Sequence, residues 1–161
     1  MPTFDIVNKI NMESFKNAID GVNREIDNRY DFKGSISKII VENENFFILA
    51  DSDMKVQQLK ELLSKNLVRK GVDVKSIIFD KAEKASGGNI RLPIILNQGI
   101  SKENAQKINK FVKELKLKIQ ISIQGDQLRV SAKKRDDLQN TISNLKNLKI
   151  DIPLNFINFR E

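Results

Sequence analysis

The chain has 161 residues, of which 40% are apolar and 30% charged. This composition supports one medium domain or two small ones with real cores, and it excludes a disordered or fibrous chain. Cysteine, histidine and tryptophan are all absent, which excludes thiolate nucleophiles, disulfides, Cys/His zinc sites and imidazole acid–base chemistry.

The net charge of +7 at pH 7 is unevenly distributed. Residues 87–161 hold 14 Lys and Arg against 7 Asp and Glu, whereas residues 1–86 hold 14 of each. A basic half predicts an anionic partner, either a nucleic acid, a nucleotide or an acidic protein, although a solvated lysine-rich surface fits the charge alone equally well. The start has no secretory signal pattern and no apolar stretch is long enough to span a membrane, so we expect a cytoplasmic protein without membrane contact.

The first half begins with an alternating run at residues 3–7, which predicts a strand. A helix is expected after Asn11, and strands at 36–41 and 46–50 are joined by a polar turn. A second helix is expected from about Ser52 to Gly71, and a strand at 74–79 follows it.

The second half repeats this order after a glycine-containing linker at 84–89. Residues 90–96 predict a strand, in which Pro93 favours an edge position or a bulge. Ser101 is expected to cap the next helix. The clearest hairpin is predicted for strands 118–123 and 127–132. A last helix is expected before a strand at 154–159.

The order strand–helix–strand–strand–helix–strand, found twice, predicts an α+β fold. We expect two ferredoxin-like (βαββαβ) plait domains, at residues 1–86 and 87–161, each an antiparallel sheet with both helices on one face. Strands 3–7 and 90–96 are both first strands on flexible tethers, so their exchange between the two sheets is left open.

The central strands of the second half carry no aromatic residue, so they lack the base-stacking platform of an RNA recognition motif. Phe4, Phe46 and Phe47 of the first half are expected mainly in the core.

Arg129, Lys133, Lys134 and Arg135 run from a strand end to a helix start, where free backbone N–H groups add to their positive charge. This favours contact with phosphate, and a helix start with incidental lysines is the other interpretation. The lysines of the 101–118 helix form either a solvated face or a surface that tracks an RNA backbone.

No acid–base pair, triad or metal cluster emerges from the sequence. Asp136 and Asp137 are neighbours whose side chains diverge on a helix, and turn or cap roles account for them and for Asp126. We therefore expect no catalytic residue, no metal, no cofactor and no enzyme activity.

Five segments, in order along nearly the whole chain, resemble the YajQ family of bacterial nucleotide-binding proteins. They are MPTFDIV (1–7), RYDFKGS (29–35), QGI (98–100), IQISIQGDQLRVSAKKRDDLQ (119–139) and PLNFINFRE (153–161). The resemblance implies a small cytoplasmic bacterial protein of two plait domains that binds nucleotides, with GTP or cyclic di-GMP as the expected ligand. Some relatives are described as cyclic di-GMP receptors that act through transcription regulators, and others as binding GTP or tRNA.

Residues of these motifs that suit a phosphorylated ligand form the predicted nucleotide site: Lys33, Gln124, Asp126, Arg129, Lys133, Arg135 and Arg160. Arginine can hold phosphate or a guanine edge through two hydrogen bonds, lysine supplies a point charge, and Asp126 or Gln124 suits the Watson–Crick edge of guanine. Tyr30 or Phe32 either stacks on a base or packs under a helix.

The chain departs from the family where Ala132 and Lys134 replace a common glycine and serine. Alanine restricts the backbone and Lys134 lacks a capping hydroxyl, so the change favours anions in general over one chosen nucleotide. The function expected is a non-catalytic nucleotide-binding protein, such as a cyclic di-GMP effector that acts through protein partners. One alternative is an RNA- or tRNA-binding protein of low sequence specificity, and another is an adaptor that binds a partner protein through an edge strand or its basic face.

Overall fold

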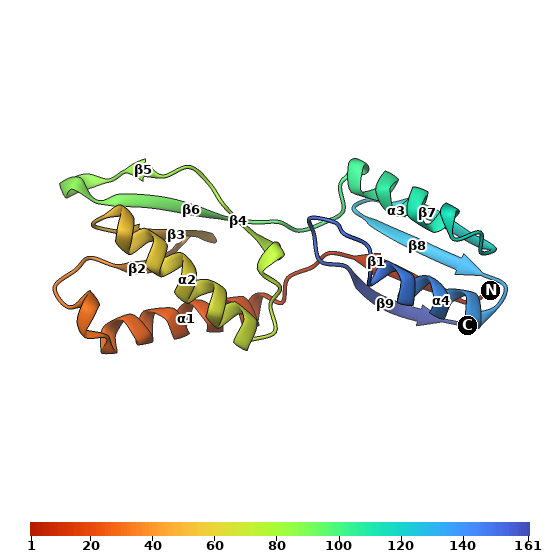
Figure 1. The fold of residues 1–161 in the computed structure, drawn as a ribbon, viewed down its shortest axis with the longest axis horizontal. Helices are drawn as coiled ribbons and strands as arrows, with labels where there is room; N and C mark the ends of the chain where they lie inside the picture. The colour runs from red at the N-terminus through yellow and green to blue at the C-terminus, as the bar shows by residue number, and fades with distance from the viewer. The chain divides into compact units, whose positions relative to one another are not determined.

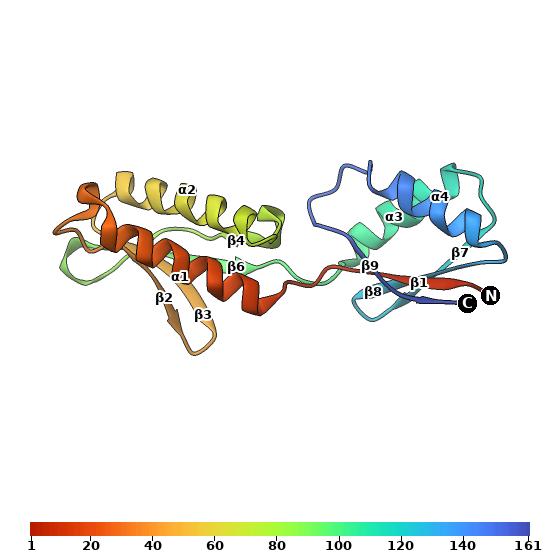
Figure 2. The ribbon, with the colours of Figure 1, turned by 90° about the horizontal axis from the view of Figure 1, so that it is seen from below.

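A computed structural model describes all residues, 1–161, and the chain divides into two compact units. The continuous unit is Ile10–Asn97, and the split unit combines Met1–Lys9 with Gln98–Glu161. Each unit is an antiparallel sheet with two helices on one face (Figures 1 and 2). The predicted α+β class with two ferredoxin-like plaits is confirmed.

The continuous unit has sheet order β2-β3-β6-β4, with β5 paired to one end of β6. Its elements are α1 (Met12–Asn28), β2 (Lys38–Glu42), β3 (Asn45–Ala50), α2 (Asp53–Arg69), β4 (Ile77–Phe79), β5 (Glu83–Lys84) and β6 (Ile90–Leu96), with 3-10 turns at Tyr30–Phe32, Val74–Ser76 and Ser86–Gly88. Asn11 and Ser52 cap the two helices as expected, each accepting a backbone N–H of the first turn. The helices approach closely at Gly21, because a Cβ there would lie 2.6 Å from the Asn66 side chain.

The split unit has sheet order β7-β8-β1-β9. Its elements are β1 (Thr3–Val7), α3 (Lys102–Glu114), β7 (Ile119–Gln124), β8 (Gln127–Ala132), α4 (Arg135–Leu145) and β9 (Asn155–Arg160). The Ser101 hydroxyl accepts from the backbone N–H of Asn104 and caps α3. Phe4 and Ile6 of β1 are fully buried beneath its helices.

The first strand of each half of the chain pairs in the other half's sheet. β1 lies between β8 and β9, and β6 lies between β3 and β4. The two cores are accordingly separate, since one contains only residues from 10 to 96 and the other only residues before 10 or after 99. The sheets thus divide the chain near residues 9 and 97 and not between 86 and 87.

Of the two positions expected for Pro93, the edge position is wrong, because β6 has strands on both sides. The bulge is confirmed, since the four steps from Phe79 to Glu83 oppose only three steps from Ile94 to Arg91. Pro93 pairs with Phe47 of β3, and its carbonyl accepts the Asp80 N–H on the opposite side. The N–H and C=O of one strand residue point to the same side of the strand. The side on which Pro93 has no N–H is therefore the side of the break between β4 and β5, so no hydrogen bond between strands is lost there.

The two sheets present opposite chemistry on the faces that no helix covers. In the split unit, strand alternation turns Gln120, Ser122, Arg129 and Ser131 outward. In the continuous unit the corresponding face is apolar, with residues such as Ile40, Phe47, Leu49, Ile78 and Ile95. The Arg91 guanidinium lies 3.7 Å from the Phe47 ring centroid, which leaves Phe47 buried although no helix covers it.

None of the four helices combines the length and the apolar character needed to cross a membrane.

The strand exchange predicts how fragments of the chain fold. Residues 10–97 contain every strand of their own sheet, so this fragment is expected to unfold in one cooperative thermal transition. Residues 98–161 lack β1, whose Phe4 and Ile6 each contribute roughly 1.5–3 kcal/mol by burial. This second fragment is expected to show no cooperative transition by circular dichroism until a peptide of residues 1–9 is added. A cooperative melt of 98–161 alone would contradict the prediction.

Candidate functional site

The seven residues predicted from the sequence lie in four regions and are not brought together in one pocket. Lys33 belongs to the continuous unit, where it follows the turn Tyr30–Phe32. Gln124 and Asp126 lie at the turn between β7 and β8. The others are Arg129 in the middle of β8 and, beyond its far end, Lys133, Arg135 and Arg160. The six residues of β8 separate the two ends by about 17–20 Å.

Arg129 is engaged with Asp5 on the open face of the split unit's sheet. Its Nε and Nη2 lie 2.9 and 3.4 Å from the two carboxylate oxygens of Asp5, which also accept the Asn158 amide at 2.9 Å. The Arg129 hydrogen bond lowers the pKa of Asp5, and the same bond raises the pKa of Arg129. Asp5 is only 3% exposed, so this pair organises the sheet and a ligand of Arg129 has to compete with it.

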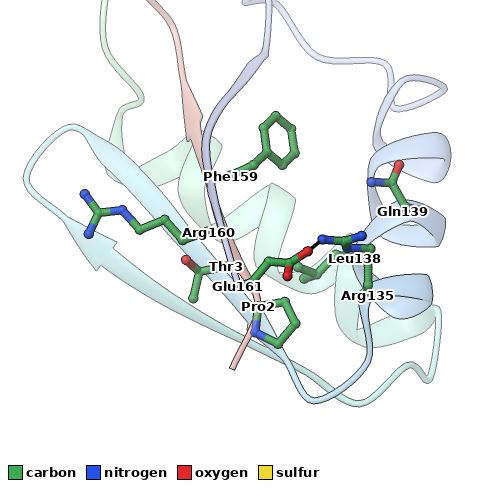
Figure 3. A pocket seen from close by; sticks show the side chains of 8 residues that line it. All are labelled: Pro2, Thr3, Arg135, Leu138, Gln139, Phe159, Arg160 and Glu161. Atoms are coloured by element: carbon green, nitrogen blue, oxygen red, sulfur yellow. Dashed lines mark ion pairs between the residues drawn. The ribbon is translucent and has the colours of Figure 1, made fainter.

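A pocket of about 400 Å³ opens between β9 and α4; we call it the Phe159 pocket (Figure 3). Its lining residues are Pro2, Thr3, Arg135, Leu138, Gln139, Phe159, Arg160 and Glu161. The Phe159 ring is 58% exposed and stacks on the buried Phe4 at 5.8 Å between ring centroids. The pocket therefore offers a fixed aromatic surface to a flat ligand.

One of the two arginines that line this pocket is Arg135, which begins α4. It forms an ion pair with the Glu161 side chain, and Figure 3 shows the two side chains pointing toward each other. The Arg160 side chain extends away from Arg135 in the same view, and its Nε donates to Asn158 at 3.1 Å. Arg135 thus serves the pocket, whereas Arg160 reaches toward the open sheet face.

The start of α4 adds a second positive feature. Lys134 occupies its N-cap position and makes no side-chain cap hydrogen bond, unlike Asn11, Ser52 and Ser101 at the other three helices. Because lysine has no hydroxyl that could accept a hydrogen bond, the first N–H groups of α4 have no side-chain cap. Asp136 and Asp137 in the first turn partly offset the positive end of the helix dipole.

Lys33 lines a second pocket, of about 550 Å³, in the continuous unit. Arg29 binds both carboxylate oxygens of Asp31, at 3.0 and 2.8 Å, and this contact lowers the pKa of Asp31. The Lys55 ammonium lies over the buried Phe32 ring, 4.5 Å from its centroid, and donates to the Asp31 carbonyl. Tyr30 is 87% exposed, so Phe32 packs in the core while Tyr30 is accessible.

Sequence comparisons show which protein family this chain resembles. The family model described as "Nucleotide-binding protein YajQ-like" matches residues 2–160. This chain belongs to the YajQ-like family. A relative from Trichlorobacter lovleyi is 47% identical over 161 residues and covers 100% of both chains. A relative from Citrifermentans bemidjiense is 46% identical over 160 residues, 99% of each chain, and one from Bacillus cereus strain AH187 is 44% identical over 158 residues, 98% of this chain and 97% of its own. All three are named nucleotide-binding proteins.

The aromatic surface of this YajQ-like chain is a feature that sequence reasoning missed. Alternation along 155–160 puts Phe156 and Phe159 on opposite faces of β9, since they are three residues apart. The register between β1 and β9 shifts near Asn158, whose φ of 57° marks a bulge. Both rings therefore contact Phe4, Phe156 edge-on at 5.9 Å and Phe159 stacked.

Gln139 was missed as well, because the sequence shows only an exposed position on the α4 helix. Their signals were two separate motifs: Gln139 is the last residue of the segment 119–139, and Phe159 lies in PLNFINFRE, from which we selected only the charged Arg160. Within the structure no group of three or more carboxylates gathers in a way that could hold a metal ion.

The lowered pKa of Asp5 predicts a pH-dependent contribution to stability. Its ionised form is favoured in the folded state, so the contribution is fully present above the ordinary pKa of 3.8 and is lost as the pH falls through the lower folded value. We expect Asp5→Asn to reduce the free energy of unfolding by about 1–3 kcal/mol at pH 7. In urea titrations the difference from the natural chain should shrink below pH 3.8.

The exposed Asp20, on α1, provides a matched control, and Asp20→Asn is expected to leave the stability nearly unchanged. A stability difference for Asp5→Asn that stays constant down to pH 2 would show that charge plays no part.

Proposed function

We propose that this protein binds a nucleotide in the Phe159 pocket and catalyses no reaction on it. The observation that carries the proposal is an exposed aromatic ring, fixed on a buried one, beside an arginine at a helix start. The ring suits a base, and a pocket of about 400 Å³ falls within the range of small-ligand sites. The names of the relatives support the same ligand class.

Arg135 and the first N–H groups of α4 are suited to hold phosphate oxygens. A guanidinium can donate two parallel hydrogen bonds to a phosphate, and the positive end of the helix favours negative charge. Lys133, exposed just before α4, adds positive charge at the same end of the sheet. Gln139 offers one amide donor and one acceptor to a base edge.

The geometry changes the roles we assign to the residues predicted from the sequence. Arg135, Arg160 and Lys133 belong to this end of the sheet, whereas Gln124 and Asp126 lie at the other end of β8. For a ligand in the Phe159 pocket we therefore assign recognition of the base edge to Gln139. Lys33 would belong to a separate site, in the continuous unit, where Tyr30 is the exposed aromatic residue.

The ligand we propose is a guanine nucleotide, either GTP or cyclic di-GMP. With cyclic di-GMP the protein would act as a signalling effector, passing the signal to a protein partner such as a transcription regulator. The family resemblance supports this choice, and the half-exposed ring of Phe159 provides one stacking position for one of its bases.

Low-specificity binding of RNA or tRNA is the second candidate. It is favoured by the polar open face of the split unit's sheet, where Arg129 and Arg160 lie among glutamine and serine side chains. Because that face has no aromatic residue, binding would depend on phosphate contacts and would weaken steeply as salt is raised.

Fluorescence anisotropy of labelled cyclic di-GMP tests the proposal. Phe159→Ala and Arg135→Ala are each expected to weaken binding at least tenfold, since stacking on a base contributes about 1–3 kcal/mol. Tyr30→Ala and Arg69→Ala, matched aromatic and cationic changes in the continuous unit, are expected to leave affinity unchanged. All four variants should keep the melting temperature of the natural chain to within a few degrees.

Competition at low and near-physiological salt separates the ligands. Displacement by unlabelled cyclic di-GMP or GTP supports a nucleotide effector, and displacement mainly by a short single-stranded RNA, lost at higher salt, supports the RNA candidate. If Tyr30→Ala abolishes binding while Phe159→Ala does not, the Phe159 pocket is the wrong site.

The ion pair between Arg135 and Glu161 generates a separate prediction. A phosphate on Arg135 must displace the Glu161 carboxylate. Glu161→Gln removes the competing charge and is expected to tighten cyclic di-GMP binding severalfold, with Glu13→Gln in α1 as the control. Unchanged or weaker binding by Glu161→Gln would show that the phosphate does not reach Arg135.

A further inference from the structure

A groove of about 580 Å³ runs beside β7, at the opposite edge of the sheet from the Phe159 pocket. We call it the β7 groove. One side is formed by Asn109, Val112 and Lys113 of α3, and the other by residues 119–122 of β7. The groove is thus bounded by a helix and by the outer edge of a strand.

The outer edge of β7 presents unpaired backbone groups. The Ala132 N–H of β8 donates to the Pro2 carbonyl, beside β1. Since backbone direction alternates along a strand, Ser131 and Arg129 of β8 turn their N–H and C=O toward β7, where their partners are Gln120 and Ser122.

The remaining residues of β7 therefore point their backbone groups away from the sheet. These are Ile121 and Ile123, together with the carbonyl of Ile119, whose N–H donates to Leu117 at 2.9 Å. Antiparallel geometry gives each of the two isoleucines a free donor and a free acceptor on this edge, Ile121 within the groove and Ile123 just beyond its lining.

This edge lacks the features that normally prevent a sheet from pairing with another chain. Proteins protect edges with proline, charge, bulges or a covering segment. β7 has the sequence IQISIQ and pairs with β8 in unbroken register. Ile123 is 62% exposed, whereas the other edge strand, β9, has the bulge near Asn158.

The charge around the groove selects the kind of partner. Residues 102–124 contain six lysines and two glutamates. Lys113 lines the groove itself, and Lys116 and Lys118 are exposed on the segment that leads into β7. A segment that enters the groove is therefore favoured if it carries Asp or Glu.

We propose that the β7 groove binds an extended acidic segment of a partner protein, which adds to the sheet as a fifth strand. Backbone hydrogen bonds to Ile121 and Ile123 would supply affinity. Alternate apolar side chains of the segment would lie against Val112 and Ile121, and its carboxylates would meet Lys113. The inference does not depend on nucleotide binding, because the Phe159 pocket lies on the other edge of the same sheet.

The test uses the full chain and a labelled eight-residue peptide of alternating Glu and Val. We expect saturable binding, with the largest amide shifts in ¹⁵N spectra at Ile121 and Ile123. The same peptide N-methylated at alternate residues cannot form the ladder on one edge and should bind at least tenfold more weakly. A Lys–Val peptide of equal length should bind more weakly than the Glu–Val peptide.

Variants of the protein supply matched pairs. Ile123→Pro and Val41→Pro change equivalent positions. Each residue lies on an edge strand, one position before the pair that closes a hairpin with a two-residue turn. We expect only Ile123→Pro to weaken binding, by at least tenfold. Lys113→Glu should weaken binding at least threefold, whereas Lys65→Glu, an exposed change on α2, should not.

Three results would overturn the proposal: no saturable binding of the Glu–Val peptide at millimolar concentration, equal binding of the N-methylated peptide, or equal loss in both proline variants. A ten-nucleotide oligouridine that displaces the peptide and shifts the same amides would also overturn it, since the groove would then be a nucleic-acid surface.

Discussion

The pairing of β1 between β8 and β9 is the interaction on which the split unit depends. Without β1 the hairpin of β7 and β8 has no connection to β9, because the sheet order is β7-β8-β1-β9. β1 also contributes Phe4 and Ile6, which are both fully buried under α3 and α4. Burial of these side chains opposes the entropy lost when the two distant ends of the chain are brought into one sheet.

The same short strand organises both faces of that sheet. On the open face Asp5 holds Arg129 and Asn158 by hydrogen bonds, and on the helix face Phe4 supports the ring of Phe159. Asn158 links the two faces, because the bulge that lets it reach Asp5 also turns Phe159 toward Phe4. The candidate nucleotide pocket is therefore a consequence of how β9 meets β1.

The two edges of the split unit differ in chemistry because one edge strand has a bulge and the other is regular. At β9 the bulge and its aromatic and charged side chains produce a compact pocket against α4. At β7 regular alternation leaves backbone groups of Ile121 and Ile123 exposed beside the lysine-rich α3. One edge is suited to a small anionic ligand and the other to an extended acidic chain, so a single sheet has room for both at once.

The sequence alone predicted most of the local structure, although the strand expected at 74–79 begins only at Ile77, after a 3-10 turn, and β5 was not predicted. The apolar spacing of Phe15, Ile19 and Val22 predicted α1, and the alternation on both sides of Gly125 predicted the hairpin of β7 and β8. These patterns succeed because helix and strand periods are properties of neighbouring residues. The five motifs likewise indicated the family, to which the chain belongs.

The tertiary structure decided what depends on residues far apart in the chain. Asp5 and Arg129 are 124 positions apart, and nothing near either residue shows that they form a pair or that Arg129 is already engaged. The interior place of Pro93 depends on the break between β4 and β5, and the exposure of Phe159 depends on the bulge in β9. Strand partners and register are set by which complementary faces meet in the folded sheet, whereas the sequence pattern specifies only that each face exists.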